Sequence, residues 1–480
     1  MIDASHPRRP ALAAFLSFVF PGLGQAYAGQ RAMAVALAMP VTLLLAATVA
    51  GVALAGDELR NLLLSEAFLA GLVVLNLALL AWRLFAIAEA GRPLAKPFGG
   101  ATLTPGRGAA IGAVLALLVV TVVMHAWAGV VIGRLGNALD DIFSGGSVSR
   151  GLDPGGGADE DPLNEPEYSW NGTERVSFLL LGTDAAPGRE ESLTDTILVV
   201  SVDPVARSAV MVSIPRDTGF MPLPDRTIYA DGLYPHKINE LASEARSDPG
   251  LWCPDLPAEA AEACGVRTLE RSVSLYIGMP IQYYAQVDLN GFASLIDAVG
   301  GLTLCLPGRM VDTEYTGPGI TGRGIELASG CGHYDGGRAL AYSRIRRGYI
   351  ELRDGTREQQ DDFKRSARQQ EVLLELRREM ANADVIFELP EVLDAVGRTV
   401  STDFPRDQAG DLASLLPLVT GSDIDRVVLG LPEYVDPPLQ PRVNYLLIPR
   451  REAVAAEMER LFGARALESW YLAGEDGPPL

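Results

Sequence analysis

The chain has 480 residues, a length that fits about two to four domains. Its 60 acidic and 40 basic side chains give a net charge of −20. Because a nucleic-acid-binding protein needs a basic face, this charge argues against a nucleic-acid partner. Arginine carries nearly all of the positive charge, which suits bidentate contacts to phosphate, although codons rich in G and C explain most of the arginine excess as well.

Residues 1–134 predict an α-helical transmembrane region. Apolar runs long enough to span a bilayer, which takes about 20 residues, lie at Met33–Ala55, Leu62–Trp82 and Ala109–Ile132. An earlier run, Ala11–Ala28, is interrupted at Pro21 and Gly22. The break favours a re-entrant or interfacial segment over a straight span, although proline and glycine also occur within spans.

The charges around these runs predict the orientation of a multi-pass membrane protein. The loop after the second run is basic and should be cytoplasmic, since it carries Arg83, Arg92, Lys96 and Arg107. The third span then leads outward and leaves the rest of the chain outside the cell. A basic N-terminus before an apolar run also fits a signal peptide, but no small-x-small cleavage site is evident and further spans follow.

Beyond the spans we expect a linker, a folded domain and a short tail. Residues 135–174 predict a flexible linker, because they hold three consecutive glycines, several prolines and acids, and no apolar period. Residues 175–465 predict the domain and 466–480 the tail. The four cysteines all lie in the domain, and an even count outside the membrane fits two disulfides. Pairing of nearest neighbours gives Cys253–Cys264 and Cys305–Cys331, and the absence of C-x-x-C spacing argues against zinc.

The domain alternates strand and helix patterns and therefore predicts a layered α/β fold. Short, almost wholly apolar runs are typical of central strands buried on both faces; they lie at Val176–Leu181, Ile197–Val202 and Ala209–Ser213. Tyr283–Val287 and Leu302–Leu306 are expected to continue the same sheet. The remaining patterns predict late strands at Arg426–Leu431 and Val443–Ile448, and helices at Gly291–Val299, Gly336–Ile345, Asp362–Met380 and Arg451–Phe462.

Charged side chains gather at the ends of the predicted strands. Asp184 follows the first strand, Asp195 precedes the second, and Arg216 follows the third directly after a proline that ends the ladder. Ligands of α/β sheets sit at strand ends, and Mg²⁺ prefers carboxylate and phosphate oxygens. These residues therefore fit a divalent cation that holds a pyrophosphate, although each acid alone could equally cap a turn.

The predicted helix from Asp362 adds a second charged group. Asp362, Arg365 and Gln369 stand at i, i+3 and i+7 and share one face, with Arg368 one turn from Arg365. A solvated face with i,i+3 ion pairs is the alternative interpretation. Arg344 and Arg346 point the same way if their segment is extended and diverge if it is helical.

Residues 175–382, and on to about residue 462, resemble the LytR–CpsA–Psr (LCP) family of cell-wall enzymes. No single sequence stretch is specific to this family, but the joint order and spacing of several stretches are. The stretches that carry the resemblance are Phe178–Asp184, Thr194–Ile197, Ser213–Thr218, Lys237–Asn239, Asp297–Gly301, Ala339–Arg346 and Asp362–Gln370.

The resemblance implies a mixed β-sheet flanked by helices and a Mg²⁺-dependent phosphotransferase. Such an enzyme moves a glycopolymer from a polyprenyl-pyrophosphate carrier to peptidoglycan, with the polyprenyl tail in an apolar cavity under the sheet. The metal ligands would be Asp184 and Asp195. The pyrophosphate would be bound by Arg216, Lys237, Arg344, Arg346, Arg365 and Gln369. The catalytic set would comprise Arg216, Asp217, Arg344, Arg346, Asp362, Arg365, Arg368 and Gln369, with Asp217 or Asp362 as the base.

Two departures from the family pattern stand out. Leu193 occupies a position where the family usually has arginine, and Arg189 would have to reach in from the loop to replace it. The family usually has one transmembrane helix, whereas this chain has three or more. A lipid-pyrophosphate hydrolase or binder, and a non-catalytic membrane-bound regulator, remain alternative functions.

Overall fold

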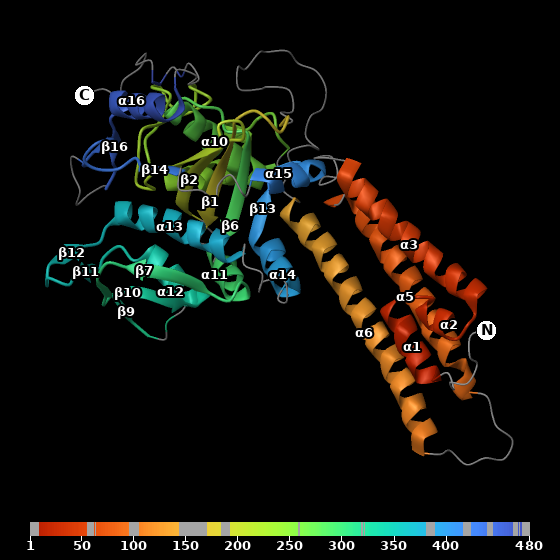
Figure 1. Ribbon diagram of the computed structural model, residues 1–480. Helices are drawn as coiled ribbons and strands as arrows, with labels where there is room; N and C mark the ends of the chain where they lie inside the picture. The colour runs from red at the N-terminus through yellow and green to blue at the C-terminus, as the bar shows by residue number, and fades with distance from the viewer. Residues whose placement is uncertain are drawn as a thin grey trace. The chain divides into compact units, whose positions relative to one another are not determined.

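The computed structural model describes residues 9–54, 62, 64–95, 105–143, 170–183, 193–257, 260–317, 320, 322–380, 389–415, 424–438, 445–463, 469 and 471–472. The chain divides into two compact units, Met1–Gly136 and Asn137–Leu480. Each unit is described by itself below, with the labels of Figure 1.

The N-terminal unit is entirely helical in its described part. Its helices are α1 (Pro10–Val19), α2 (Leu23–Tyr27), α3 (Arg31–Leu54), α5 (Glu66–Ala95) and α6 (Pro105–Ile142). Three segments of the described chain are long and apolar enough to cross a membrane: Arg31–Gly51, Glu66–Arg92 and Gly106–Ile142. The three expected spans are thus confirmed as helices. The second begins later than hydropathy predicts because the hydroxyl of Ser65 caps it, accepting a hydrogen bond from the Phe68 amide.

The interrupted run at the N-terminus does break where Pro21 and Gly22 predict. Gly22 has a φ of 99°, a left-handed conformation that favours glycine, and it separates α1 from α2. Helix α1 packs along α5, where Arg83 Nη2 donates a hydrogen bond of 2.8 Å to the carbonyl of Phe18. Gln25 is buried and donates to the carbonyl of Ala86 at 2.9 Å, which fixes α2 on the same helix.

The structure describes both ends of the range expected to be a linker, residues 135–174, and finds contacts or helix at each. Helix α6 continues to Ile142 because no glycine pair or proline interrupts it before residue 144. At the other end, Trp170 is buried and its indole Nε1 donates to the carbonyl of Glu174 at 2.8 Å. Residues 144–169 lie outside the described chain.

The C-terminal unit is built on a mixed six-stranded sheet, as the family resemblance implies. The strand order is β13 (Val400–Thr402), β6 (Tyr283–Asp288), β1 (Val176–Thr183), β2 (Thr194–Asp203), β3 (Ser208–Ser213) and β14 (Ile424–Val428). Strand β1 runs antiparallel to β2, and β2 antiparallel to β3, whereas β6 is parallel to β1 and β14 is parallel to β3.

Both faces of this sheet are buried, which explains why the central strands are apolar at successive positions. Leu179 and Val199 face one cluster, which is closed by α8 (Ile238–Ser247), α10 (Ala261–Ile277) and α16 (Arg451–Phe462). Phe178 and Val200 face the other cluster, toward α13 (Asp362–Met380) and α15 (Ala409–Leu415). Figure 1 shows α13 crossing one face of the sheet and α10 and α16 on the other.

Helix α13 is also shared with a second core. That core contains Val372 and Leu376 of α13 and the helices α11 (Leu289–Ala298), α12 (Gly336–Arg344) and α14 (Leu389–Thr399). Its strands are β7 (Leu302–Leu306), β10 (Gly330–Tyr334), β8 (Arg309–Asp312), β9 (Ile325–Leu327), β11 (Tyr349–Glu351) and β12 (Arg357–Gln359). The remaining short elements are β4 (Met221–Pro222), β5 (Leu233–Tyr234), α9 (Pro249–Trp252), η3 (Arg406–Gln408), β15 (Val435–Asp436) and β16 (Ile448–Pro449).

The expectation that Leu302–Leu306 continues the main sheet is wrong. In the part of the chain that the structure describes, this strand, β7, pairs with β10 alone, in a two-stranded ribbon. Its alternate residues Thr303 and Cys305 are exposed, so it has one buried face rather than two. The late strand predicted at Val443–Ile448 is limited, in its described part, to β16, which pairs with β15.

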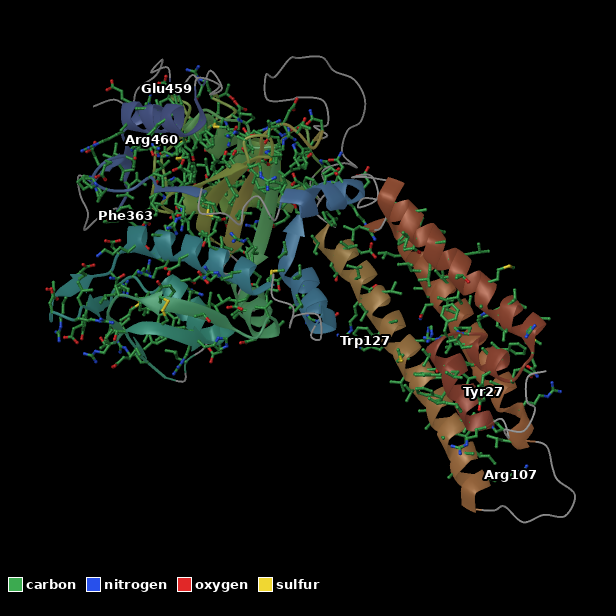
Figure 2. The ribbon with its side chains drawn as sticks, viewed as in Figure 1. Tyr27, Arg107, Trp127, Phe363, Glu459 and Arg460 are labelled. Carbon is green, nitrogen blue, oxygen red and sulfur yellow. A yellow bond between two sulfur atoms is a disulfide. The ribbon has the colours of Figure 1, made fainter. Side chains whose placement is uncertain are left out.

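Both predicted disulfides are confirmed. Cys253 after α9 is bonded to Cys264 in α10, and Cys305 of β7 is bonded to Cys331 of β10, its partner across the ribbon. Figure 2 draws such bonds in yellow. The first bond lies in the core closed by α8, α10 and α16, and the second links the two strands of the ribbon in the core that α13 shares.

A partly buried acid on α10 predicts a pH-dependent stability. Burial, and then the nearby carboxylate of Asp403, raise the pKa of Glu270 well above its ordinary value. The folded pKa therefore exceeds the unfolded pKa of about 4.3. The stability contributed by this group is complete below the unfolded pKa and is lost as the pH rises through the folded pKa.

We therefore expect Glu270→Gln, which stays neutral, to raise the unfolding midpoint of the full chain in detergent at pH 8 and to give no gain at pH 4. The measurement is differential scanning fluorimetry at both pH values. Glu459→Gln, in an exposed position on α16 (Figure 2), is the matched control. A lower midpoint for Glu270→Gln at pH 8 would show that the carboxylate stabilises the fold.

Candidate active site

The strand topology brings distant parts of the chain to one edge of the main sheet. Because β1, β2 and β3 form an antiparallel series, the end of β1, the start of β2 and the end of β3 lie at the same edge. The sequence reaches this edge at Thr183, Thr194 and Ser213. Three of the charged residues predicted for the site lie within three positions of these strand ends: Asp184, Asp195 and Arg216.

Asp195 occupies an irregularity in the sheet. Gly182 pairs with Thr196 and Thr183 pairs with Thr194, so Asp195 is an extra residue with no partner in the register. A β-bulge of this kind redirects the side chain and is common beside active sites. The bulge therefore explains how a carboxylate can leave the alternation of an otherwise apolar strand.

Arg216 reaches Asp195 from the turn that follows β3. Both the amide and the hydroxyl of Thr218 donate to the carbonyl of Pro215, at 3.0 and 2.7 Å, which closes the turn. The Arg216 guanidinium then donates through Nη1 to Asp195 Oδ1 at 2.6 Å. The start of α8 supports the same turn, because the amide of Asn239 donates to the carbonyl of Arg216 at 3.3 Å.

Helix α13 adds the second arginine and the second acid. Arg365 Nη1 lies 3.0 Å from Asp362 Oδ1, and Arg365 Nη2 donates to the carbonyl of Asp195 at 3.3 Å. Arg216 Nε lies 4.0 Å from the same Asp362 oxygen. The structure thus brings Asp195, Arg216, Asp362 and Arg365 together, as the sequence predicts, and we call these four residues the charged cluster.

The start of α13 is held in place by a cap and by a close contact. The Asp361 carboxylate accepts a hydrogen bond of 2.8 Å from the amide of Lys364, in the manner of an N-cap. Phe363, labelled in Figure 2, packs against Gly430 so closely that a Cβ at position 430 would lie 2.4 Å from its ring. Position 430 must therefore lack a side chain for α13 to approach the strand edge.

The electrostatics of the charged cluster differ between its two arginines. Burial alone would lower the pKa of Arg216, but the carboxylates of Asp195 and Asp362 outweigh it and raise the pKa above its ordinary value. Burial lowers the pKa of Arg365, because Asp362 offsets only part of the desolvation and Arg216 adds repulsion. Both guanidinium groups remain charged at neutral pH.

Two donors of the charged cluster have no acceptor among the described residues. The Nε–H groups of Arg216 and Arg365 are buried and make no hydrogen bond within the described chain. A buried donor without an acceptor costs about 1–3 kcal/mol, and two such donors from guanidinium groups in one cluster indicate that an oxygen-rich anion satisfies them. Phosphate oxygens match guanidinium donors in both geometry and charge.

A further ion pair lies next to the charged cluster. Lys237 Nζ donates to Asp217 Oδ1 at 2.6 Å, and the Asp217 side chain is almost fully buried. The pair is positioned by the start of α8, where the amide of Ile238 donates to the carbonyl of Thr218 at 2.8 Å. Asp217 contributes to the field at both arginines of the cluster.

Arg368 does not face the charged cluster. Its buried guanidinium donates to the carbonyls of Tyr342 and Ile345 at the end of α12, and to the side chain of Gln360. Burial lowers its pKa to about 10. Periodicity places Arg368 one turn from Arg365, but its guanidinium extends to the carbonyls at the end of α12 and not to the charged cluster. Its observed contacts are those of a brace for the segment that carries Arg344 and Arg346.

The other predicted site residues lie around this arrangement or outside the described chain. Arg344 ends α12 and Arg346 follows it, both partly buried, and Gln369 lies one turn beyond Arg365 on α13. Leu193 is partly buried just before β2. Asp184 and Arg189 lie outside the described residues, so the replacement of the missing arginine stays a prediction.

Sequence reasoning missed one segment of the site. Leu447 is joined to residues 217–219 by two backbone hydrogen bonds, which bring Tyr445 near the turn after β3, and the carboxylates of Asp217 and Asp362 act on its phenol. The sequence around Tyr445 predicts a short strand but carries no signal of its partner. Only the tertiary fold shows that this strand lies beside the turn after β3.

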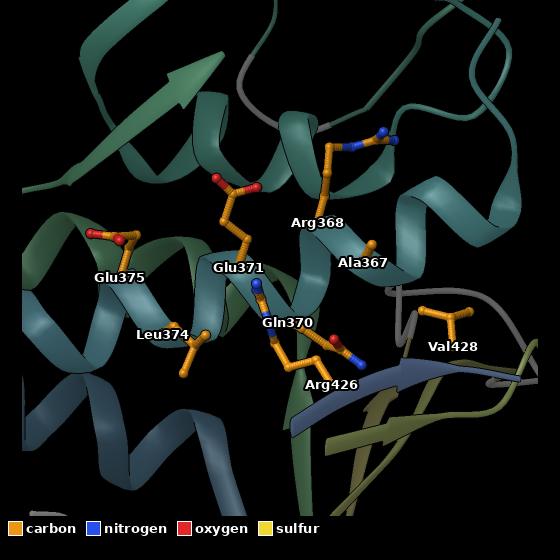
Figure 3. A pocket seen from close by; sticks show the side chains of 8 residues that line it. All are labelled: Ala367, Arg368, Gln370, Glu371, Leu374, Glu375, Arg426 and Val428. Carbon is orange, nitrogen blue, oxygen red and sulfur yellow. The ribbon is translucent and has the colours of Figure 1, made fainter. Parts of the chain in front are cut away.

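A hollow of about 690 Å³ lies between α13 and β14. Leu374 and Val428 contribute apolar surface, whereas Glu371, Glu375 and Arg426 are charged. Figure 3 shows Arg368 extending from α13 on the side away from Val428. The hollow is mixed in character, so it differs from the apolar cavity expected for a polyprenyl tail, and that cavity stays a prediction.

The described residues offer part of a metal site. Asp195 is a hard oxygen donor next to two arginines that suit phosphate, and Mg²⁺ is commonly held by one or two carboxylates together with phosphate oxygens. No group of three metal-ligating side chains occurs within the described chain. The donor chemistry of Asp195 therefore fits the ion, while the second expected ligand, Asp184, lies outside the described residues.

A mixed sheet whose edge carries paired acids and arginines defines a class of domain suited to binding a multiply charged phosphate ligand. The sequence profile of the LytR_cpsA_psr family matches residues 157–432. The chain therefore belongs to the LytR–CpsA–Psr family, as the resemblance in its motifs indicates.

Individual relatives give the same family likeness. A Bacillus mycoides (strain KBAB4) protein named polyisoprenyl-teichoic acid–peptidoglycan teichoic acid transferase TagU is 28% identical over 240 residues, which cover 50% of this chain and 64% of that protein. The TagU of Oceanobacillus iheyensis is 28% identical over 292 residues, covering 61% of this chain and 76% of its own. The crystal structure of B. subtilis TagV is 24% identical, with a TM-score of 0.43, and the match covers 60% of this chain and 97% of TagV.

Removal of the Arg368 brace should destabilise the fold. We expect Arg368→Gln to lose stability on the order of 2 kcal/mol or more, because it leaves buried carbonyls without their donor. Thermal unfolding of the full chain in detergent measures the loss. Arg353→Gln, at an exposed position, should change the midpoint little. A midpoint for Arg368→Gln equal to that of Arg353→Gln would contradict the structural role.

Proposed function

We propose that the domain is a phosphotransferase that moves a glycopolymer from a polyprenyl-pyrophosphate carrier to peptidoglycan. The observation that carries the proposal is the pair of guanidinium groups of Arg216 and Arg365, whose buried Nε–H donors lack acceptors within the described chain and lie beside two carboxylates. The names of the TagU relatives, which act between a polyisoprenyl-linked polymer and peptidoglycan, support the same substrate class.

The reaction needs positioning and charge neutralisation more than covalent chemistry. An acceptor hydroxyl oxygen bonds to the phosphorus that bears the glycan. The bond from that phosphorus to the bridging oxygen breaks, and polyprenyl phosphate leaves with the bonding electrons. Arg216 and Arg365 hold the phosphate oxygens and offset the negative charge that spreads over them in the transition state.

The proton of the acceptor hydroxyl needs a base, and Asp362 is the better placed of the two expected candidates. Both carboxylates are ion-paired, but the side chain of Asp362 is 23% exposed and that of Asp217 only 7% exposed. A hydroxyl can therefore approach Asp362 more readily. Asp217 then serves to hold Lys237 near the phosphate oxygens.

We further propose that Mg²⁺ binds at Asp195 together with Asp184. When bound, the ion would offset charge on the pyrophosphate. The bulge in β2, which takes Asp195 out of the regular register of the strand, supports this proposal. Asp195 also accepts a hydrogen bond of 2.6 Å from Arg216, so the ion and the arginine would share this carboxylate.

The apolar helices at the N-terminus anchor the chain in a membrane, and we propose a multi-pass arrangement with the domain outside the cell. Two disulfides in the domain support an oxidising compartment. A membrane anchor keeps the site close to a lipid-linked substrate. Membrane lipid, the lipid-linked glycan and peptidoglycan are accordingly the proposed partners.

Truncation of either arginine of the charged cluster should abolish transfer. We expect Arg216→Ala and Arg365→Ala to lower transfer by about 100-fold or more, the range found when one oxyanion-stabilising donor is removed. The assay is the formation of glycan-linked peptidoglycan by the full chain in lipid vesicles. Arg353→Ala, an exposed arginine on the turn after β11, is the matched control.

Each outcome of this assay has a separate meaning. Transfer at the wild-type rate in either cluster variant would contradict the site. Release of glycan phosphate by the wild type without any wall-linked product would contradict ligation and identify a lipid-pyrophosphate hydrolase.

Removal of the divalent cation should test whether Asp195 binds Mg²⁺ in addition to pairing with Arg216. We expect EDTA to weaken binding of farnesyl pyrophosphate to the wild type, and Mg²⁺ to restore it, because the ion offsets charge on the diphosphate. Asp195→Asn should lose this Mg²⁺ response. Isothermal titration of the full chain in detergent measures both effects, and Asp425→Asn, at an exposed position, is the control. Equal affinity with and without Mg²⁺ would contradict the metal proposal.

A further inference from the structure

A short segment near the C-terminus is fastened to the turn that carries Arg216. The amide of Leu447 donates to the carbonyl of Asp217, and the amide of Gly219 donates to the carbonyl of Leu447, both at 2.9 Å. Thr218 and Leu447 form a parallel bridge. We call Tyr445–Leu447 the strap, because it lies along the turn after β3 although more than 200 residues separate the two in sequence.

The strap fits closely because one glycine leaves room for it. A Cβ at Gly219 would lie 2.4 Å from Leu446 Cγ, closer than such atoms can approach. Leu446 is buried, and Leu447 is almost fully buried. The two leucines therefore fix the position of the strap, and the neighbouring Tyr445 is held near the turn after β3.

Tyr445 is exposed, unlike the two residues that follow it. Its side chain has a relative exposure of 41%. Burial of the phenol, and then the carboxylates of Asp217, Asp362 and Asp361, raise the pKa of Tyr445 above its ordinary value. The phenol is therefore neutral throughout the physiological range, and three carboxylates lie within electrostatic reach of it.

These surroundings restrict what the ring can contact. A polyprenyl chain would gain little next to three carboxylates, because apolar groups need apolar surface to leave water. A phosphate would be repelled by the same acids and is better placed on Arg216 and Arg365. An exposed aromatic face beside carboxylates does suit a sugar, whose C–H groups can lie on the ring while its hydroxyls donate to the acids.

We propose that Tyr445 is a specificity residue that contacts the sugar joined directly to the pyrophosphate. The ring covers one face of that sugar, and Asp361, exposed at the start of α13, accepts from its hydroxyls. The proposal rests on the phosphotransferase function proposed above and adds the part of the substrate that the strap recognises. Tyr445 thus selects glycan-bearing carriers over bare lipid pyrophosphate.

The test compares two probes on the full chain in detergent: farnesyl pyrophosphate, and farnesyl pyrophosphate carrying one N-acetylglucosamine. Isothermal titration should show that the wild type binds the sugar-bearing probe about tenfold more tightly, a difference of about 1.4 kcal/mol. Tyr445→Ala should lose this preference and keep its affinity for the bare probe. Tyr445→Phe, which retains the ring, should keep most of the preference.

Controls separate recognition from folding and from the proposed function itself. Val205→Ala changes another exposed side chain, 76% exposed, at the opposite end of β2, and should behave as the wild type. An equal loss of affinity for both probes in Tyr445→Ala, or an unchanged preference, overturns the role of Tyr445. Failure of the wild type to bind either probe overturns the proposed function of the whole site instead.

Discussion

The antiparallel pairing of β1, β2 and β3 is the constraint on which the candidate site depends. It places the end of the first and third strands and the start of the second at one edge, so side chains far apart in sequence meet there. The bulge at Asp195 then turns one carboxylate out of the alternation. Helix α13 completes the cluster because Gly430 lets its first turn approach the same edge.

The charges at this edge are balanced within the protein. Arg216 is paired with Asp195, Arg365 with Asp362, and Lys237 with Asp217. The cations are therefore held in place before a ligand arrives, which reduces the conformational entropy lost on binding. The Nε–H groups of the two arginines remain available for an anion, so the ion pairs orient the guanidinium groups without using all of their donors.

Much of this fold could be predicted from local sequence. The apolar runs gave the three central strands, and the helix at Asp362–Met380 has the predicted bounds. The shared face of Asp362 and Arg365 follows from helical periodicity alone. The pairing of cysteines followed from their nearest neighbours in sequence.

Other features depend on contacts that no local pattern contains. Arg368 has the same spacing signal as Arg365, yet its guanidinium binds a carbonyl at the end of α12 and not a group of the cluster. One face of β7 is exposed, and β7 pairs with β10 in a separate ribbon. A run of five residues gives only a weak sequence signal of that exposed face. The strap meets the turn after β3 through backbone hydrogen bonds, which are independent of side-chain type and leave no trace in the sequence.

The Cys305–Cys331 bond has a practical consequence for making the protein. It joins β7 to β10, and their ribbon belongs to the core that supports α12 and its arginines. A host that synthesises the chain in a reducing cytosol leaves this ribbon without its covalent link. Recombinant protein should therefore be exported, or produced in a strain that oxidises thiols, before its activity is assayed.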